Sequence, residues 1–294
     1  MSLFSLFGAI EIGLIFALVA LGVYISFRLL RFPDLTVDGS FPLGGAVCAV
    51  LIAAGINPWV ATLAATAAGA VAGMVTGWLN VKLKIMDLLA SILMMIALYS
   101  VNLRIMGGPN VPLINDPTIF NLLQPTGMED YVFRPLLLLV IVVAAKLALD
   151  WFFATERGLA IRATGSNPRM ARAQGVNTGA MILLGMAVSN GLVGLAGAMF
   201  VQTQGGSDIS MGIGTIVIGL AAVIVGESIL PSRKIIWATL AVVVGAIVYR
   251  FFIAAALNSD FIGLKAQDLN LVTAVLVTIA LVIPQLKRKL SRKP

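Results

Sequence analysis

The chain of 294 residues contains no histidine and a single cysteine, Cys48. The absence of histidine excludes histidine-based metal sites, proton relays and catalytic triads. A single cysteine excludes an internal disulfide and a cysteine-rich metal site. We therefore expect this chain to bind no metal and no cofactor of its own.

Charged residues are also scarce, at 11% of the chain, whereas an average soluble domain carries about 25%. Hydrophobic residues make up 60%, and the mean hydropathy is +1.02. A helical crossing of the hydrocarbon core takes about 20 apolar residues, and lipid offers no partner to an open sheet edge. The composition therefore predicts an all-α polytopic membrane protein in which residues 1–294 form one transmembrane domain.

Two motifs of hydrolytic enzymes are missing as well. The sequence holds no Gly-x-x-x-x-Gly-Lys-Ser/Thr phosphate loop and no Gly-x-Ser-x-Gly nucleophile turn. We therefore expect no ATP hydrolysis by this chain and no enzymatic activity. The acidic residues fall mostly at predicted span ends rather than in pairs at mid-membrane, which weakens an ion-coupled mechanism.

What the chain does contain is a series of long apolar runs, which predicts about nine spans, within a range of eight to ten. The runs cover residues 7–30, 42–56, 58–81, 86–106, 135–153, 180–201, 213–225, 235–255 and 269–284. Four prolines interrupt the pattern in 107–134, which is the longest outer connection and is long enough for a lid or a docking surface. Glycines at every fourth position, Gly69, Gly73 and Gly77, predict a smooth helical face for close packing.

The basic residues set the orientation. The chain holds 20 Lys and Arg residues for a net charge of +7. If the N-terminus lies outside, only Arg104, Arg134, Arg250 and Lys265 fall at outer ends; Lys146 lies within a span and all the others fall in inner connections. This distribution follows the positive-inside rule. We therefore expect an outer N-terminus, a cytoplasmic C-terminus and no nucleic-acid partner.

The polar stretch 31–45, which carries two prolines and two acids, allows two interpretations. It is either a cytoplasmic turn followed by a helix with Ser40 as N-cap and Pro42 in its first turn, or a re-entrant or broken helix whose polar residues line a cavity. Asn190, in the sixth span, is likewise either an interhelical hydrogen-bonding group or a pathway-lining one. The candidate pathway residues are Asp34, Thr36, Asp38, Ser40, Ser189 and Asn190.

A second polar stretch, residues 155–178, separates the fifth and sixth runs. It contains four arginines and only one acidic residue, Glu156. Asn167 followed by Pro168 makes an N-cap and first turn, and Gly175 is placed as a C-terminal cap, so a helix is predicted over 168–174. So short a helix is not stable alone in water, so the bundle or a partner has to hold it. The simplest alternative is a solvated basic loop that only satisfies the positive-inside rule.

The segment from Glu156 to Asn177 resembles a family pattern, Glu-Arg-Gly-x-Ala-x-Arg-Ala-x-Gly-x-Asn-Pro-x-x-Ala-x-x-x-Gly-Val-Asn. It is similar to the coupling segment of permease subunits of bacterial ABC importers, in the branched-chain amino acid and ribose permease superfamily. The resemblance implies a short helix that docks into a cleft of a cytoplasmic ATPase. The residues it assigns to ATPase coupling are Arg157, Gly158, Arg162, Gly165, Asn167, Pro168, Arg169, Ala171, Arg172, Gly175 and Asn177.

The resemblance also implies the partners. They are a second permease copy forming a homodimer, two copies of an ABC ATPase that bind ATP and Mg, and an extracytoplasmic substrate-binding protein, all at the bacterial cytoplasmic (inner) membrane. The mechanism implied is ATP-driven alternating access.

A further resemblance concerns the cargo. The Asp34-Leu-Thr-Val-Asp-Gly-Ser40 stretch is similar to the Asp-Leu-Ser-Val-Gly segment of sugar permeases, but it departs from that segment by Asp38 and the following Phe41-Pro42. The longer sequence of residues 31–44 is more similar to the tryptophan-type amino-acid permease branch than to the sugar permeases. The expected cargo is an amino acid, aromatic in particular, with nucleosides or sugars as alternatives. The rival functions are a secondary transporter or channel acting alone and a scaffold or sensor without transport.

Overall fold

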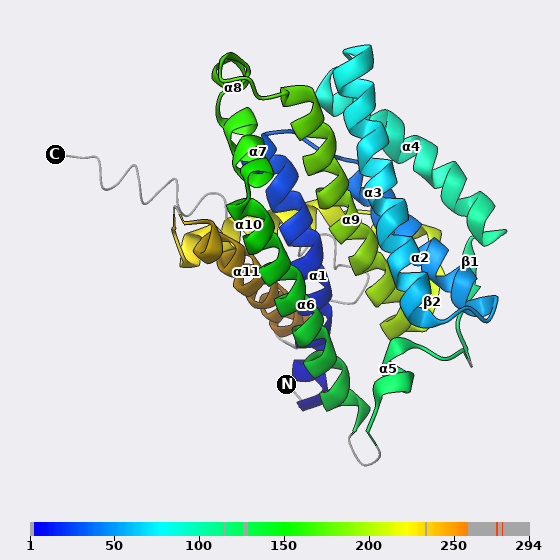
Figure 1. The fold of residues 1–294 in the computed structure, drawn as a ribbon. Helices are drawn as coiled ribbons and strands as arrows, with labels where there is room; N and C mark the ends of the chain where they lie inside the picture. Colours follow the sequence, from blue (N-terminus) through cyan, green and yellow to red (C-terminus); the bar gives the residue numbers. More distant parts are fainter. Residues whose placement is uncertain are drawn as a thin grey trace.

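The computed structural model describes residues 3–114, 116–125, 129–232 and 234–257, together with positions 275 and 278. The described part of the chain folds as a helical bundle with one short pair of antiparallel strands (Figure 1). The helices are α1 (Leu3–Val23), α2 (Val37–Ala53), α3 (Pro58–Leu83), α4 (Asp87–Met106), α5 (Ile119–Leu123), α6 (Asp130–Ala154), α7 (Glu156–Ser166), α8 (Pro168–Ala173), α9 (Thr178–Gln204), α10 (Thr215–Ile229) and α11 (Ile235–Leu257). A π-helical segment η1 (Tyr24–Leu30) continues α1, and a 3-10 turn η2 (Ile209–Gly212) precedes α10.

Seven helical segments in the described part of the chain are long and apolar enough to cross a membrane. They contain seven of the nine predicted runs. The second run forms α2, which has 17 residues and is shorter than the others. The ninth, 269–284, lies outside the described residues apart from two isolated positions. The prediction of a polytopic helical membrane protein is confirmed.

The two long polar connections lie at opposite ends of the bundle (Figure 1). One end carries α7 and α8, whereas α5 lies at the other end together with the N-terminus and the strands β1 (Asn110–Pro112) and β2 (Gly206–Asp208). The strands pair antiparallel, with Asn110 opposite Asp208. This pairing joins the 107–134 connection to the turn after α9, a contact between segments almost 100 residues apart that no local pattern signals.

Small residues bring the central helices into backbone contact. A Cβ on Gly73 would lie 2.1 Å from the carbonyl oxygen of Met186, and a Cβ on Gly44 would lie 2.1 Å from that of Gly194. Helices α2, α3 and α9 therefore approach as closely as backbones allow, which is how helices associate in lipid. The predicted packing role of the glycine face on α3 is confirmed. Nearby, the ring of Phe41 in α2 stacks on Phe16 of α1 and makes a tilted contact with Phe200 of α9.

The start of α2 corrects the predicted turn in 31–45. The helix begins at Val37, with Thr36 as its N-cap, so Ser40 is not the N-cap and Pro42 lies beyond the first turn. The preceding backbone is irregular, and Arg31 adopts a left-handed conformation with φ 57°. Asp34, in this irregular stretch, is fully buried among the helices. Just before the helix, Asp34 accepts the backbone N–H of Thr36 at 3.0 Å, a turn between a side chain and the backbone two residues on that leads into α2.

Candidate functional site

The α7–α8 segment (residues 155–178) is built from side-chain caps. The Thr155 hydroxyl accepts from the N–H of Gly158, Asn167 Oδ1 accepts from the N–H of Met170 at 3.1 Å, and Asn177 Oδ1 accepts from that of Ala180 at 3.1 Å. The predicted short helix is confirmed as α8, and Gly175 follows it with φ 84°. The sequence prediction missed α7, whose first turn is capped by Thr155.

Helix α7 packs on the rest of the bundle through its glycines. A Cβ on Gly165 would lie 1.7 Å from the carbonyl oxygen of Leu29 in η1, and one on Gly158 would lie 2.3 Å from that of Phe152. Ile161 is fully buried and Ala171 nearly so. The segment is therefore held by the bundle, and a displacement of α7 has to move η1, because no space separates their backbones.

The opposite face of the α7–α8 segment is open. Arg157, Arg169 and Arg172 are exposed, and Arg162 is partly buried. Between the last two exposed arginines Met170 is 62% exposed, an apolar side chain flanked by cations. Sequence reasoning did not single out Met170, although its place between Arg169 and Arg172 was a usable signal. Aromatic residues, methionine and arginine are enriched at protein interfaces, so this face has the composition of a docking surface.

An ion pair connects η1 to α10 at the same end of the bundle. Arg28 donates from Nε to one carboxylate oxygen of Glu227 at 2.6 Å and from a terminal nitrogen to the other oxygen. Two parallel bonds from one guanidinium fix the relative orientation of the two groups. Contacts therefore run from α7 through η1 to α10.

A buried polar cluster lies inside the bundle, formed by Asp34, Ser40 and Asn190. Asn190 donates from Nδ2 to Asp34 Oδ2 at 2.7 Å and accepts from the Ser40 hydroxyl at 2.7 Å. All three side chains are fully buried. Asp34, whose other oxygen accepts the N–H of Thr36, thus has hydrogen bonds to both oxygens, as a carboxylate out of water requires. The cluster joins α9 to the start of α2.

Thr36 and Ser189 are buried beside this cluster. The hydroxyls of Thr36 and Thr76 lie 2.9 Å apart, which joins the start of α2 to α3. The Ser189 hydroxyl donates to the Gly22 carbonyl at 2.7 Å, which joins α9 to α1. Five of the six candidate pathway residues are therefore fully buried and joined by hydrogen bonds between segments of this chain, and the sixth, Asp38, is less buried.

Asp38 caps a second helix from a distance. Its carboxylate accepts the N–H of Ile216 at 2.8 Å and that of Gly214 at 3.3 Å, both at the start of α10. A carboxylate is stabilised by the unpaired N–H groups and the partial positive charge of a helix N-terminus. Asp38 therefore fixes the start of α10 against the first turn of α2, a contact between residues 176 and 178 positions apart.

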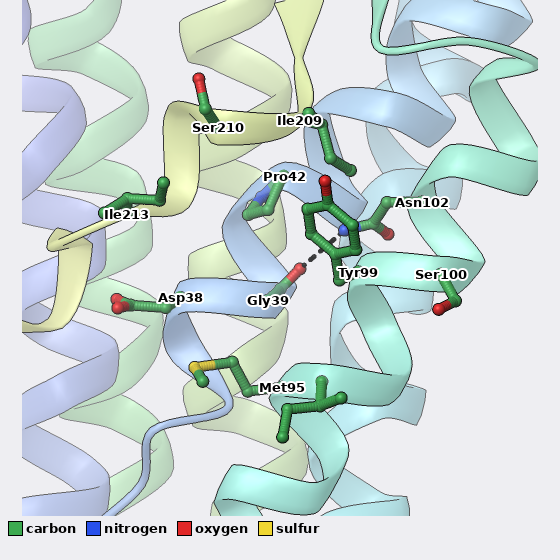
Figure 2. A pocket seen from close by; sticks show the side chains of 11 residues that line it. Asp38, Gly39, Pro42, Met95, Tyr99, Ser100, Asn102, Ile209, Ser210 and Ile213 are labelled. Carbon is green, nitrogen blue, oxygen red and sulfur yellow. Dashed lines mark hydrogen bonds between the residues drawn. The ribbon is translucent and has the colours of Figure 1, made fainter.

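Asp38 also lines a cavity of about 580 Å³ between α2, α4 and η2 (Figure 2). The lining residues are Asp38, Gly39, Pro42, Met95, Ile96, Tyr99, Ser100, Asn102, Ile209, Ser210 and Ile213. In Figure 2 Met95 and Tyr99 reach from α4 toward α2, and Ile213 lies above Asp38. Sequence reasoning missed the α4 residues, because a span of mostly apolar residues does not reveal which of its faces borders a hollow.

The fold and these regions define a class: a multi-pass helical membrane protein with a basic helical segment at one end and a cavity between its helices. The comparisons with known proteins make this specific. Residues 5–283 match the family model described as branched-chain amino acid transport system / permease component. The chain belongs to that family. It is a permease of the bacterial cytoplasmic membrane, which confirms the resemblance seen in the sequence.

Among similar proteins, the tyrosine transport system permease protein of Clostridioides difficile is 39% identical over 280 residues, covering 95% of this chain and 91% of that protein. A galactofuranose transporter permease protein of Escherichia coli is 28% identical, covering 88% and 73%, and a ribose import permease protein of the same species is 26% identical, covering 87% and 78%. No solved structure matches the chain significantly.

Proposed function

We propose that this chain is the transmembrane subunit of an ATP-binding cassette importer that moves an amino acid, aromatic in particular, into the cell. The observation that carries the proposal is the family match over residues 5–283, which includes the α7–α8 segment with its exposed arginines. The chain lacks a phosphate loop, so a partner has to hydrolyse ATP. That partner is an ATPase dimer that binds ATP and Mg, and a second permease copy and an external binding protein complete the importer.

The coupling residues act in two groups. Arg157, Arg169 and Arg172, with Met170, present the exposed docking face to the ATPase. Gly158, Gly165, Asn167 and Gly175 give α7 and α8 their shape and their contact with η1. Nucleotide-driven closure of the ATPases displaces α7, and η1 and the Arg28–Glu227 pair carry that displacement to α10. ATP shifts the equilibrium between outward and inward access only because it binds the two states with different affinity.

The cargo assignment rests on similarity. The tyrosine transport permease is more alike in sequence than the sugar permeases, at 39% identity against 28% and 26%. Sugars and nucleosides are the alternatives. The pathway passes beside α2, where Asp38 borders the cavity, while Asp34, Thr36, Ser40, Ser189 and Asn190 hold the helices that form its wall. A secondary transporter acting alone is less well supported, because it gives the exposed basic segment no role.

Charge reversal of the docking face tests the ATPase partnership. In the double variant Arg169→Glu, Arg172→Glu, we expect the ATPase recovered with the purified permease to fall at least tenfold, because acids replace cations at the contact. The matched control is Lys82→Glu, Lys84→Glu, which makes the same change in charge on exposed residues at the end of α3 beside α9. Equal recovery of ATPase by both variants would contradict docking through α8.

A further inference from the structure

The cavity between α2, α4 and η2 has a wall suited to an apolar ligand. Met95 and Ile96 from α4, Pro42 from α2 and Ile213 after η2 contribute aliphatic surface, and Tyr99 contributes an aromatic ring. Small-molecule sites are mostly apolar clefts of about 300–1,000 Å³ with a few placed polar groups. At about 580 Å³ this cavity falls within that range and exceeds the volume of a large amino acid.

The polar groups that line the cavity include the hydroxyls of Tyr99, Ser100 and Ser210. Asn102 is fully buried, and its Nδ2 donates to the Gly39 carbonyl at 3.2 Å. Its Oδ1 has no hydrogen-bond partner among the described residues. Asp38 adds a carboxylate, and the cavity's lining holds no Lys or Arg. No part of Asn102 is accessible from the cavity, so the charged group that faces a ligand is the Asp38 carboxylate, and a cationic hydrogen-bond donor is favoured here.

We propose that this cavity is the subsite through which the permease holds its cargo during transport, and that it takes an amino acid with a large apolar side chain. The ammonium group lies toward Asp38, and the side chain lies against Met95, Ile96 and Tyr99. This inference rests on the proposed function, because the ligand of the subsite is the amino acid that the importer is proposed to move. The lack of a cation disfavours anions that carry no amine.

Filling the cavity tests the proposal in the complete importer. We expect Met95→Trp to lower the rate of radiolabelled tyrosine import at least tenfold, because the indole occupies the space of the cargo side chain. Leu93→Trp is the matched control, since Leu93 is exposed on the same helix and does not line the cavity. Recovery of the assembled complex monitors folding. If Met95→Trp assembles and imports tyrosine like the control, the subsite is not there.

A labelling measurement tests occupancy without import. Ser100→Cys lines the cavity and Val101→Cys does not, and both positions are exposed. Each is made in a Cys48→Ala background, and a maleimide is added to the purified complex without binding protein. Millimolar tyrosine should slow labelling of position 100 at least fivefold and leave position 101 unchanged, and 3-(4-hydroxyphenyl)propionate, which lacks the ammonium group, should protect neither.

The two measurements separate the two proposals. Protection by tyrosine without ATP-driven import would leave the cavity standing and overturn the proposed function. If ATP-driven tyrosine import is the same in Met95→Trp and Leu93→Trp, and tyrosine does not slow labelling of position 100 relative to position 101, the subsite is overturned and the importer stands. Equal protection of position 100 by tyrosine and by the propionate would contradict an ammonium site at Asp38.

Discussion

Two polar regions of this permease use asparagine in opposite settings. In the α7–α8 segment Asn167 is exposed and caps a six-residue helix, with the arginines pointing to solvent. In the buried cluster Asn190 is fully enclosed and joins Asp34 to Ser40. An exposed cap exchanges its hydrogen bond with water when it is lost, whereas a buried amide leaves its partners unpaired. The first region should therefore govern assembly and the second the stability of the bundle.

The largest effect is expected where the α7–α8 segment packs against the rest of the bundle, at Gly165. In Gly165→Val the new side chain collides with the Leu29 carbonyl of η1, so α7 cannot keep its position against η1. Overpacking costs about 1–3 kcal/mol and more where backbone atoms cannot yield. We expect little folded permease in membranes. Gly108→Val is the control, because nothing lies within 4 Å of a Cβ there. Equal amounts of both variants by fluorescence-detected size exclusion would show that α7 is not held this way.

The next effect is expected at Asn190. Asn190→Leu removes both side-chain contacts, so Asp34 and Ser40 lose their interhelical partner inside the bundle. A destabilisation of about 3 kcal/mol follows from leaving a buried carboxyl group and a buried hydroxyl without this partner. Thermal unfolding of the purified permease in detergent checks it. A melting temperature within one degree of the unchanged protein would contradict a structural role for the cluster.

A smaller and local effect is expected at Asn167. Loss of an N-cap in Asn167→Ala destabilises a helix by about 1 kcal/mol. Since α8 is exposed at the end of the bundle, global unfolding should not change, while ATPase recovery falls about fivefold, the equivalent of that energy. Asn167→Ser restores the cap and should restore the recovery. A drop in melting temperature as large as that of Asn190→Leu would erase the contrast between the two regions.

The smallest effect on stability is expected at the Arg28–Glu227 pair. It is partly exposed, and such pairs contribute about 0–1 kcal/mol. Arg28→Met should therefore leave the melting temperature nearly unchanged while lowering ATP-dependent import, because the connection from η1 to α10 is lost. The swapped variant Arg28→Glu, Glu227→Arg should recover part of the import. Import unchanged in Arg28→Met would remove the pair from the coupling route.

The sequence predicted those parts of the fold that depend on local pattern. Apolar runs near 20 residues located the long spans because the bilayer imposes that length. The Asn167-Pro168 pair and Gly175 located α8 because caps are local chemistry. The expected cap at Ser40 was wrong: the helix begins at Val37, after a turn at Asp34, and Asp34 is hydrogen-bonded to Asn190, 156 residues away.

The rest of the candidate site depends on contacts between distant segments. The match between Asp38 and the start of α10 and the pairing of β1 with β2 both need the tertiary structure. Helix α7 escaped prediction because Gly158 and Gly165 are unfavourable in a helix, and here they are required by the close approach of α7 to the Phe152 and Leu29 backbones. The α4 residues that line the cavity could not be inferred from composition either, because the face of a span that borders a cavity is decided by the tertiary structure.

The central claim is that a separate cytoplasmic ATPase drives this permease through α7 and α8. It is tested most directly by import into sealed vesicles. The vesicles hold the permease with its ATPase, and the binding protein loaded with radiolabelled tyrosine is outside. We expect tyrosine to accumulate only with ATP inside; accumulation should be lost in Arg169→Glu, Arg172→Glu and kept in Lys82→Glu, Lys84→Glu. Full accumulation by the permease alone, without ATP and driven by an ion gradient, would contradict it.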